Sequence, residues 1–251
     1  IVDLTSPVEV NIGMVDPDSY TCSAENAYAM TTCYVNGDSQ PVDSPSHTID
    51  ALVGFPYTAS GAAFPGTVMT YVEPDHLATM GQIGSTWGLA WSQQTEQVYV
   101  GSFLKRHVAL GPLGLDGIYR VDFSTGTAVV ESWLELDDTL GIDIGQSLVP
   151  DILTRDLPTT LNGPSYDELV YPLIATVGLG DVDLVSDEAL DPGGLSSDGW
   201  IDREFLLAVN LYSKDILVID PASSQLIMTY NIPAPAPACT NGTHRPWAVD
   251  Y

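Results

Sequence analysis

A pattern of four short apolar strands occurs twice in this chain and begins a third time at Arg245–Tyr251. The first copy comprises Thr86–Trp91, Val98–Phe103, Gly117–Asp122 and Ala128–Trp133. The second copy comprises Leu179–Leu184, Phe205–Asn210, Asp215–Asp220 and Leu226–Asn231. Four strands per copy, with a turn rich in Asp, Ser, Thr or Gly before the fourth, are typical of a β-propeller blade. The sequence therefore predicts an all-β fold of propeller type, with the first strand of each blade innermost.

The repeats divide the chain into two parts. Residues 1–49 form an irregular N-terminal segment, in which only Val8–Val15 alternates like a strand. Residues 50–251 hold the blades, and Asp50–Tyr57 and Gly66–Val72 read as two strands ahead of the first full copy. We expect about three to four blades here and about six to seven in the full propeller. Because three strands should follow the last one, we also expect the propeller to be completed by further chain or by another molecule.

The interval between copies is longer than the roughly 40–50 residues usual for propeller repeats. Two insertions account for the excess, Asp137–Val177, with a short helix at Tyr166–Val170, and Ser186–Arg203. Glu73–Met80 reads as a helical turn or a loop. Function in such folds usually resides in loops of this kind rather than in the blades.

The chain is strongly acidic, with 33 Asp and Glu against seven Lys and Arg and a formal net charge of −26. Such a surface repels phosphate backbones and anionic headgroups, which argues against binding to nucleic acid or to a membrane surface. The sequence also has no run of about 18 or more apolar residues, so we expect no membrane insertion. It favours solubility, cation binding and saline or extracellular surroundings. A diffuse, solvated acidic surface is the simpler interpretation, and a specific multi-cation function is the alternative.

The cysteines point to an oxidising compartment. Cys22 and Cys33 lie in a polar segment without the further ligands that a zinc site needs, so we expect a local disulfide. Cys239 is left without a partner, which suggests one outside this segment. Asn241 begins a glycosylation sequon, although a chance match is an equal explanation. The start at Ile1 fits a secreted chain after removal of a signal peptide, or a trimmed one.

Several segments carry a resemblance to a known family: Cys33–Asp38, Leu52–Tyr57, Gln82–Trp91, Ser102–His107, Gly111–Pro112, Gly117–Arg120, Gly178–Asp183 and Val209–Leu211. From about residue 20 to residue 251 the chain resembles bacterial secreted or cell-surface proteins with a propeller-like region. That region often stands ahead of serine-aspartate-repeat B-type or similar extracellular modules. The resemblance implies a surface-exposed β-propeller and no established activity.

Asp181 and Asp183 stand at alternate positions of a first strand, so both carboxylates point to one face. First strands line the central channel of a propeller, where two carboxylates and the nearby Asn210 could bind Ca²⁺. The alternative is that the two aspartates cap backbone amides. The acidic insertion Ser186–Arg203 does not have the spacing of a calcium loop.

Lys105, Arg106 and His107 gather three of the few basic groups. An internal ion-pair network is the simpler interpretation, because arginine binds carboxylates bidentately. The alternative is an anion site, or a general base at His107.

Asp122 and Asp220 end the third strand of each copy and are expected to accept hydrogen bonds from backbone amides of the following turn. At least three of the five tryptophans should pack in the blades, and Trp200, in an acidic glycine-rich loop, is the exception.

Two functions remain. The first is a non-enzymatic extracellular or cell-surface propeller for adhesion, recognition or filament assembly, with a protein, a glycan or further copies of the same protein as partner. The second is a Ca²⁺-dependent propeller hydrolase or lactonase with its metal in the channel. No phosphate loop, dinucleotide fingerprint, nucleophile elbow or zinc-helix motif occurs in the sequence.

Overall fold

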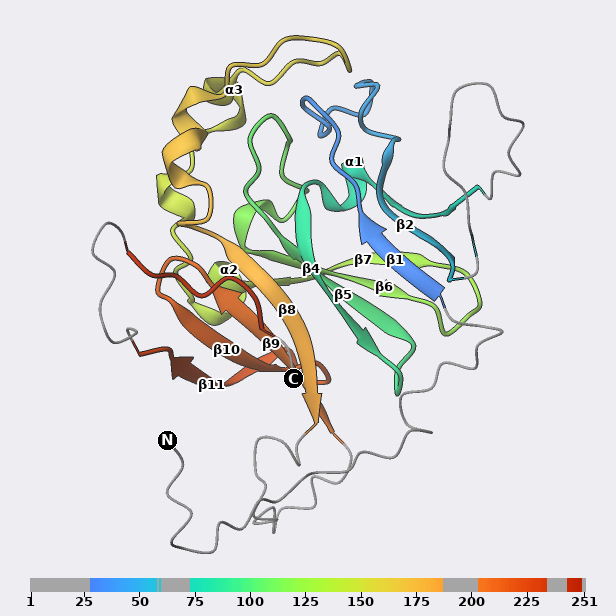
Figure 1. Cartoon of the computed structure of the whole chain (residues 1–251), viewed down its shortest axis with the longest axis vertical. Helices are drawn as coiled ribbons and strands as arrows, with labels where there is room; N and C mark the ends of the chain where they lie inside the picture. The colour runs from blue at the N-terminus through green and yellow to red at the C-terminus, as the bar shows by residue number, and fades with distance from the viewer. Residues whose placement is uncertain (1–27, 58, 60–72, 187–202, 234–242, 250–251) are drawn as a thin grey trace, which may run out of the picture. The chain divides into compact units, whose positions relative to one another are not determined.

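In the computed structural model of the chain, residues 28–57, 59, 73–186, 203–233 and 243–249 are described (Figure 1). The chain divides into two compact units. One is formed by Ile1–Ala29 and Phe55–Glu73, most of which lies outside the described residues; the other is formed by Met30–Gly54 and Pro74–Tyr251. The expected division into 1–49 and 50–251 stays a prediction.

The first repeat is a four-stranded antiparallel sheet in the order β4-β5-β6-β7. Its strands are β4 (Thr86–Ser92), β5 (Gln97–Ser102), β6 (Gly117–Asp122) and β7 (Val129–Glu135). The two central strands carry the longest runs of buried residues, since β5 is buried from Val98 to Ser102. The predicted strand order of this copy is confirmed, with boundaries shifted by at most two residues.

The second repeat is a four-stranded antiparallel sheet in the order β8-β9-β10-β11. Its strands are β8 (Leu179–Ser186), β9 (Glu204–Asn210), β10 (Asp215–Asp220) and β11 (Gln225–Asn231). Six consecutive residues of β9 are buried, whereas β11 is exposed over most of its length. This copy is also confirmed as a sheet, and the described chain is all-β with only short helical segments.

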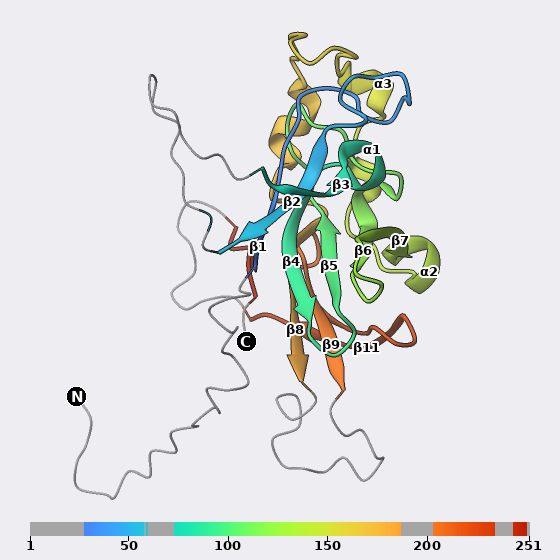
Figure 2. The same cartoon turned by 90° about the vertical axis from the view of Figure 1, so that its right-hand side faces the viewer.

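The first strands of the two sheets lie next to each other without pairing in one sheet (Figures 1 and 2). Gly88 of β4 makes the close approach possible: a Cβ added there would stand 2.5 Å from the backbone nitrogen of Val182 in β8. Gly88 also has φ +45, a conformation that favours glycine.

A third sheet contains β1 (Tyr28–Thr32), β2 (Asp50–Pro56) and β3 (Asp75–Thr79). The helical turn or loop expected at Glu73–Met80 is therefore wrong for most of its length, and only Met80 begins the short helix α1 (Met80–Ile83). The reason is tertiary: β3 pairs with β2 and buries Leu77 and Ala78. The five residues of β3 include only two adjacent apolar residues, Leu77 and Ala78. Such a short segment shows no alternation from which a strand could be predicted.

The insertion after β7 contains α2 (Leu136–Leu140), η3 (Gln146–Leu148), α3 (Ile152–Arg155) and η4 (Glu168–Leu173). The predicted helix at Tyr166–Val170 corresponds to the 3₁₀ helix η4, which begins two residues later. Pro172 lies inside η4. Short helical segments of this kind commonly adopt the 3₁₀ form.

The expected third first-strand at Arg245–Tyr251 is not assigned as a strand over its described part, residues 245–249. Pro246 has no backbone N–H to donate to a ladder. This segment nevertheless contacts the second sheet through a backbone hydrogen bond, in which Asp181 N of β8 donates to Trp247 O at 3.0 Å. The strands expected at Val8–Val15 and Gly66–Val72 lie outside the described residues.

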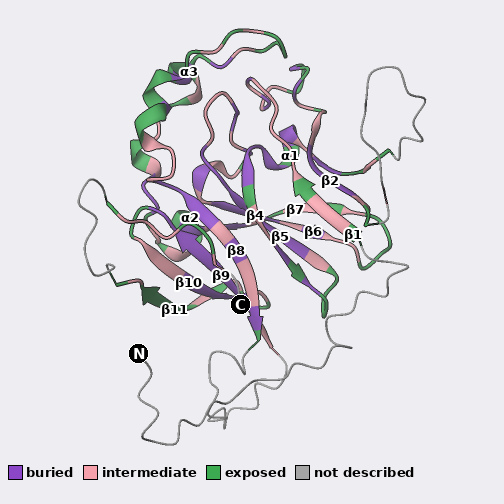
Figure 3. Cartoon of the chain, viewed as in Figure 1, coloured by how far each residue is buried: buried purple, intermediate pink, exposed green. Residues whose placement is uncertain are grey.

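The core has two main clusters of buried side chains, shown in purple in Figure 3. One joins the two four-stranded sheets to the insertion and contains Tyr99, Ile144, Leu179 and Leu206. The other joins β2 and β3 to the face of the first sheet that carries Val98 and Val100. Among the described residues, no helix is both long and apolar enough to cross a membrane.

Candidate functional site

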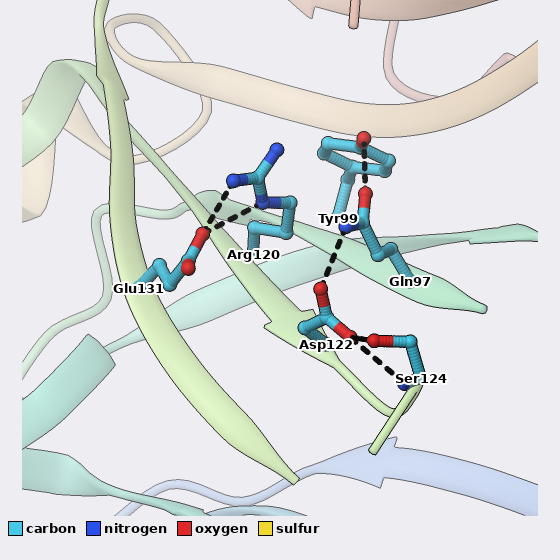
Figure 4. Close-up of polar contacts among 6 residues, drawn as sticks. All are labelled: Gln97, Tyr99, Arg120, Asp122, Ser124 and Glu131. Carbon is cyan, nitrogen blue, oxygen red and sulfur yellow. Dashed lines mark hydrogen bonds and ion pairs between the residues drawn. The ribbon is translucent and has the colours of Figure 1, made fainter. Parts of the chain in front are cut away.

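Asp122 organises the turn after β6 (Figure 4). Its Oδ1 accepts hydrogen bonds from the backbone N of Ser124 at 2.8 Å and from the Ser124 hydroxyl at 2.6 Å. Its Oδ2 accepts from Gln97 Nε2 at 2.9 Å. These bonds to Ser124 and Gln97 hold the pKa of the Asp122 carboxyl below its usual value. The predicted structural role is confirmed.

Asp220 does the same in the second repeat. Its Oδ1 accepts from the backbone N of Ala222 at 3.0 Å, and its Oδ2 accepts from Ser223 Oγ and Arg203 Nη2, both at 2.6 Å. Burial acts to raise the pKa of Asp220, but the hydrogen bonds of Ser223, Ala222 and Arg203 outweigh it and lower the pKa overall. Both Asp122 and Asp220 are thus engaged in turn hydrogen bonds.

The expected calcium ligands have structural partners. Asp181 Oδ1 and Asp183 Oδ1 accept from the backbone N of the residue that follows each, at 3.1 and 2.8 Å. Asn210 is 1% exposed; its Oδ1 accepts from the backbone N of Tyr212 and of Ser213, and its Nδ2 donates to Asp143 O. Two accepted bonds occupy both lone pairs of the Asn210 oxygen. Among the described residues no group of three or more His, Cys, Asp or Glu could hold a metal ion, and Ca²⁺ binding stays a prediction.

Lys105, Arg106 and His107 each contact another part of the chain. The Lys105 Nζ lies 4.1 Å from the centre of the Tyr34 ring, and Arg106 Nη2 donates to Tyr166 O at 2.7 Å. The acidic contact is made by the backbone N of His107, which donates to Asp167 Oδ2 at 2.7 Å. Within the part of the chain that the structure describes, none of these three side chains forms an ion pair, and the expected ion-pair cluster stays a prediction.

A buried ion pair next to this segment is formed by Arg155 and Asp167. The sequence analysis did not identify either residue. Arg155 Nε and Nη2 donate to Asp167 Oδ1 and Oδ2 at 3.0 and 2.8 Å, and the two side chains are 2% and 0% exposed. Arg155 Nη2 also donates to the backbone oxygens of Lys105 and Val108. The pair therefore joins the insertion to the loop after β5.

The environment keeps Asp167 ionised. Burial acts to raise its pKa, but the hydrogen bonds from Arg155 and His107 lower it overall. In the sequence, the only sign of this pair is an isolated arginine in the acidic insertion. Arg155 lies 50 positions from Lys105 and Asp167 lies 60 positions from His107, so no local pattern connects them.

The insertion exposes large apolar side chains beside this ion pair. Leu153 of α3 and Tyr166, Leu169 and Tyr171 in and before η4 are 86%, 72%, 50% and 68% exposed. We call these four residues the α3–η4 face. The helices pack on each other, and Figure 3 shows the α3 region largely in the exposed colour. The Arg106 guanidinium lies 5.4 Å from the centre of the Tyr171 ring, a cation–π contact that helps to hold this ring.

A pocket of about 300 Å³, lined mostly by residues with polar side chains, lies between the two four-stranded sheets, at their turn ends. Arg120 of β6 enters it, held by Glu131 of β7 through Nε and Nη2 at 2.8 and 2.5 Å (Figure 4). Tyr99 Oη donates to Gln97 Oε1 at 3.0 Å, and burial raises the pKa of Tyr99. No pattern in the sequence marks this pocket, because its walls come from residues more than 100 positions apart.

Cys33 forms no disulfide with another described residue, and burial followed by the charge of Asp50 raises the pKa of its thiol. Cys22, Cys239 and Asn241 lie outside the described residues, so the Cys22–Cys33 bond and the glycosylation stay predictions.

The four described tryptophans each contact another aromatic ring, as packing roles require. Trp133 meets Tyr99 edge-on at 4.9 Å. Trp87, Trp91 and Trp247 nevertheless remain 38%, 47% and 39% exposed. Trp200 lies outside the described residues.

Comparisons with known proteins add little. No family model matches the chain. Colossin-A of Dictyostelium discoideum is 30% identical over 162 residues, which are 61% of this chain. The match covers 1% of the length of Colossin-A. No solved structure matches.

Proposed function

We propose that this chain is a non-catalytic recognition module of a secreted or cell-surface protein, and that its two four-stranded sheets are blades of a β-propeller. The repeated strand order and the equivalent turn aspartates support the blades. The first strands β4 and β8 lie together, as inner strands of neighbouring blades do. The strong negative charge and the resemblance to bacterial surface proteins support the location.

The α3–η4 face is the observation that carries the proposal. Leu153, Tyr166, Leu169 and Tyr171 stand on a segment that leaves the regular sheet, and each is at least half exposed. Large apolar side chains that stay exposed close together in one segment can mark an interaction site. Tyrosine is also enriched in protein interfaces, because it combines a large apolar ring with a hydrogen-bonding hydroxyl.

The buried Arg155–Asp167 pair makes this face a rigid one. It fixes the insertion to the carbonyl groups of Lys105 and Val108, so a partner meets a surface that is already ordered. A pre-ordered surface loses less conformational entropy on binding.

The charge around the face indicates the kind of partner. Asp151, Asp156 and Glu168 are exposed next to it. We therefore propose a protein partner that offers apolar anchors surrounded by Lys and Arg.

The test compares two triple variants of the fluorescently labelled chain on cells of the organism that produces it. The first is Leu153→Ser, Tyr166→Ser and Tyr171→Ser; the matched control is Val129→Ser, Ile227→Ser and Tyr230→Ser, which removes exposed apolar groups elsewhere. Flow cytometry should show about tenfold weaker binding for the first variant and little change for the control. Binding should also weaken as NaCl rises from about 0.05 to about 0.5 M.

Two results would contradict the proposal. One is a wild-type chain that binds these cells no better than an unrelated acidic β-protein. The other is equal binding by both triple variants, each shown to be folded by circular dichroism.

A further inference from the structure

The pocket between the two four-stranded sheets has no part in the function proposed above. It is bounded on one side by the β4–β5 turn and by Arg120, and on the other by Arg203, Glu204 and the β10–β11 turn. Its volume of about 300 Å³ is at the small end of ligand sites, which suits one small molecule rather than a chain segment.

Its charged side chains are fixed before any ligand arrives. Glu131 holds Arg120, Asp220 holds Arg203 at 2.6 Å, and Ser92 donates to Glu204 Oε2 across the gap between the sheets. The two arginine side chains are 24% and 33% exposed, so they are partly desolvated without being closed off. Such orientation by neighbours lowers the entropic cost of binding.

The charge balance limits the class of ligand. Two guanidinium groups stand with three carboxylates, those of Glu131, Glu204 and Asp220. This surplus of negative charge, within a chain of net charge −26, disfavours phosphate and sulfate. The two guanidinium groups offset much of the attraction that the carboxylates would exert on an ammonium ion near Glu204.

What the walls offer is a set of hydrogen-bond donors and acceptors side by side. A guanidinium has five N–H donors, of which Glu131 takes two from Arg120. Glu204 uses one oxygen for Ser92, and its second oxygen can accept from a ligand. Pro221 and Ala222 add apolar surface at the rim.

A ligand that matches this wall is uncharged, small and rich in hydroxyl groups, because each hydroxyl both donates and accepts. We propose that the pocket binds a neutral monosaccharide unit, with Arg120 and Arg203 donating to its oxygens and Glu204 accepting from its hydroxyls.

The experiment follows backbone amide NMR signals of the isotope-labelled chain during titration with D-glucose, D-galactose, D-mannose and N-acetyl-D-glucosamine. The sugar concentration extends to about 50 mM, so that a site with a Kd of about 1 mM would be saturated. Sodium sulfate and methylammonium chloride are the charged comparison probes. At least one sugar should shift signals of residues 92–97 and 203–204 in a saturable way.

Variants then assign the binding to the pocket. Glu204→Gln keeps the shape of the side chain and Arg120→Lys keeps the charge, and each should weaken sugar binding at least about tenfold, because a hydrogen bond to a charged group is lost. Glu168→Gln, which removes a carboxylate on the insertion, should bind the sugar as the wild type does. Dispersed amide signals in each variant show that it is folded.

The proposal is overturned if no sugar gives saturable shifts, or if Glu204→Gln binds as tightly as the wild type. It is also overturned if sulfate or methylammonium binds the pocket more tightly than every sugar, which would assign an anion or an amine site. None of these results bears on the α3–η4 face, which the cell-binding test addresses separately.

Discussion

Several carboxylates among the described residues accept hydrogen bonds from the backbone. Asp122, Asp167 and Asp220 each accept a backbone N–H as well as a side-chain donor. In all three the pKa is lowered, since the ionised form is the better acceptor. Part of the acidic composition is thus required by turns and anchors rather than by a ligand.

The two equivalent turn aspartates differ in burial, and this gives a matched pair of variants. The side chain of Asp220 is 6% exposed, while Asp122 is half-buried. We expect Asp220→Ala to lower the free energy of unfolding by about 2–3 kcal/mol, because Arg203 and two turn donors lose their acceptor. Asp122→Ala should lower the free energy of unfolding by less, because the Asp122 carboxyl is more accessible to water. Urea denaturation measures both, and equal losses would contradict the role assigned to burial.

The Arg155–Asp167 pair predicts a large effect and a pH signature. Asp167→Asn leaves a guanidinium that is 2% exposed without its counter-charge, which should cost about 3–5 kcal/mol. The control is Asp156→Asn, at an exposed position in the same segment, which should change the free energy of unfolding little.

The sign of the pH effect follows from the lowered pKa of Asp167. Its contribution to stability is fully present above the ordinary aspartate pKa of about 3.9 and is lost as the pH falls through the lower folded value. The wild type should therefore lose more stability than Asp167→Asn on acidification below about pH 4. Urea denaturation at several pH values tests this, and parallel curves would rule it out.

At the scale of secondary-structure elements, the contact between β4 and β8 depends on one position. Gly88 combines a positive φ with a gap that admits no side-chain atom, because the backbone of Val182 fills it. Two separate sheets can therefore place their first strands in contact. The same approach helps to position the pocket at the turn ends of the sheets.

We expect Gly88→Ala to be more destabilising than a glycine change without a close neighbour. Gly126 provides the control, since it has φ +79 and a methyl group placed on its Cα would meet no atom within 4 Å. Gly126→Ala should cost about 1–2 kcal/mol from backbone strain alone. Gly88→Ala should cost about 1–3 kcal/mol more, since the strands must separate. Equal chemical denaturation midpoints for the two variants would show that β4 and β8 tolerate a wider spacing.

At the scale of the whole molecule, the excess of acidic residues creates electrostatic self-repulsion. A formal net charge of −26 opposes the compact state, and salt screens that repulsion. We expect the Tm to rise as NaCl is increased from about 0.02 to about 0.5 M.

The same measurement separates screening from a specific calcium site. If screening is the whole effect, about 1 mM CaCl₂ should raise the Tm no more than NaCl of equal ionic strength. A much larger rise with CaCl₂ would support the predicted Ca²⁺ site, since a ligand that binds only the folded state stabilises it. A Tm that falls with NaCl would contradict the repulsion argument.

The sequence by itself determined the two four-stranded repeats and the role of Asp122 and Asp220. Both depend on local chemistry, since strand periodicity and turn residues act over a few positions. Only the tertiary structure decided that Asp75–Thr79 is a strand, because β2 supplies its pairing partner. It also decided the Arg155–Asp167 anchor, the α3–η4 face and the pocket shared by Ser92 and Glu204. These features bring together residues that are far apart in the chain. A local sequence pattern does not indicate which distant residues will come into contact.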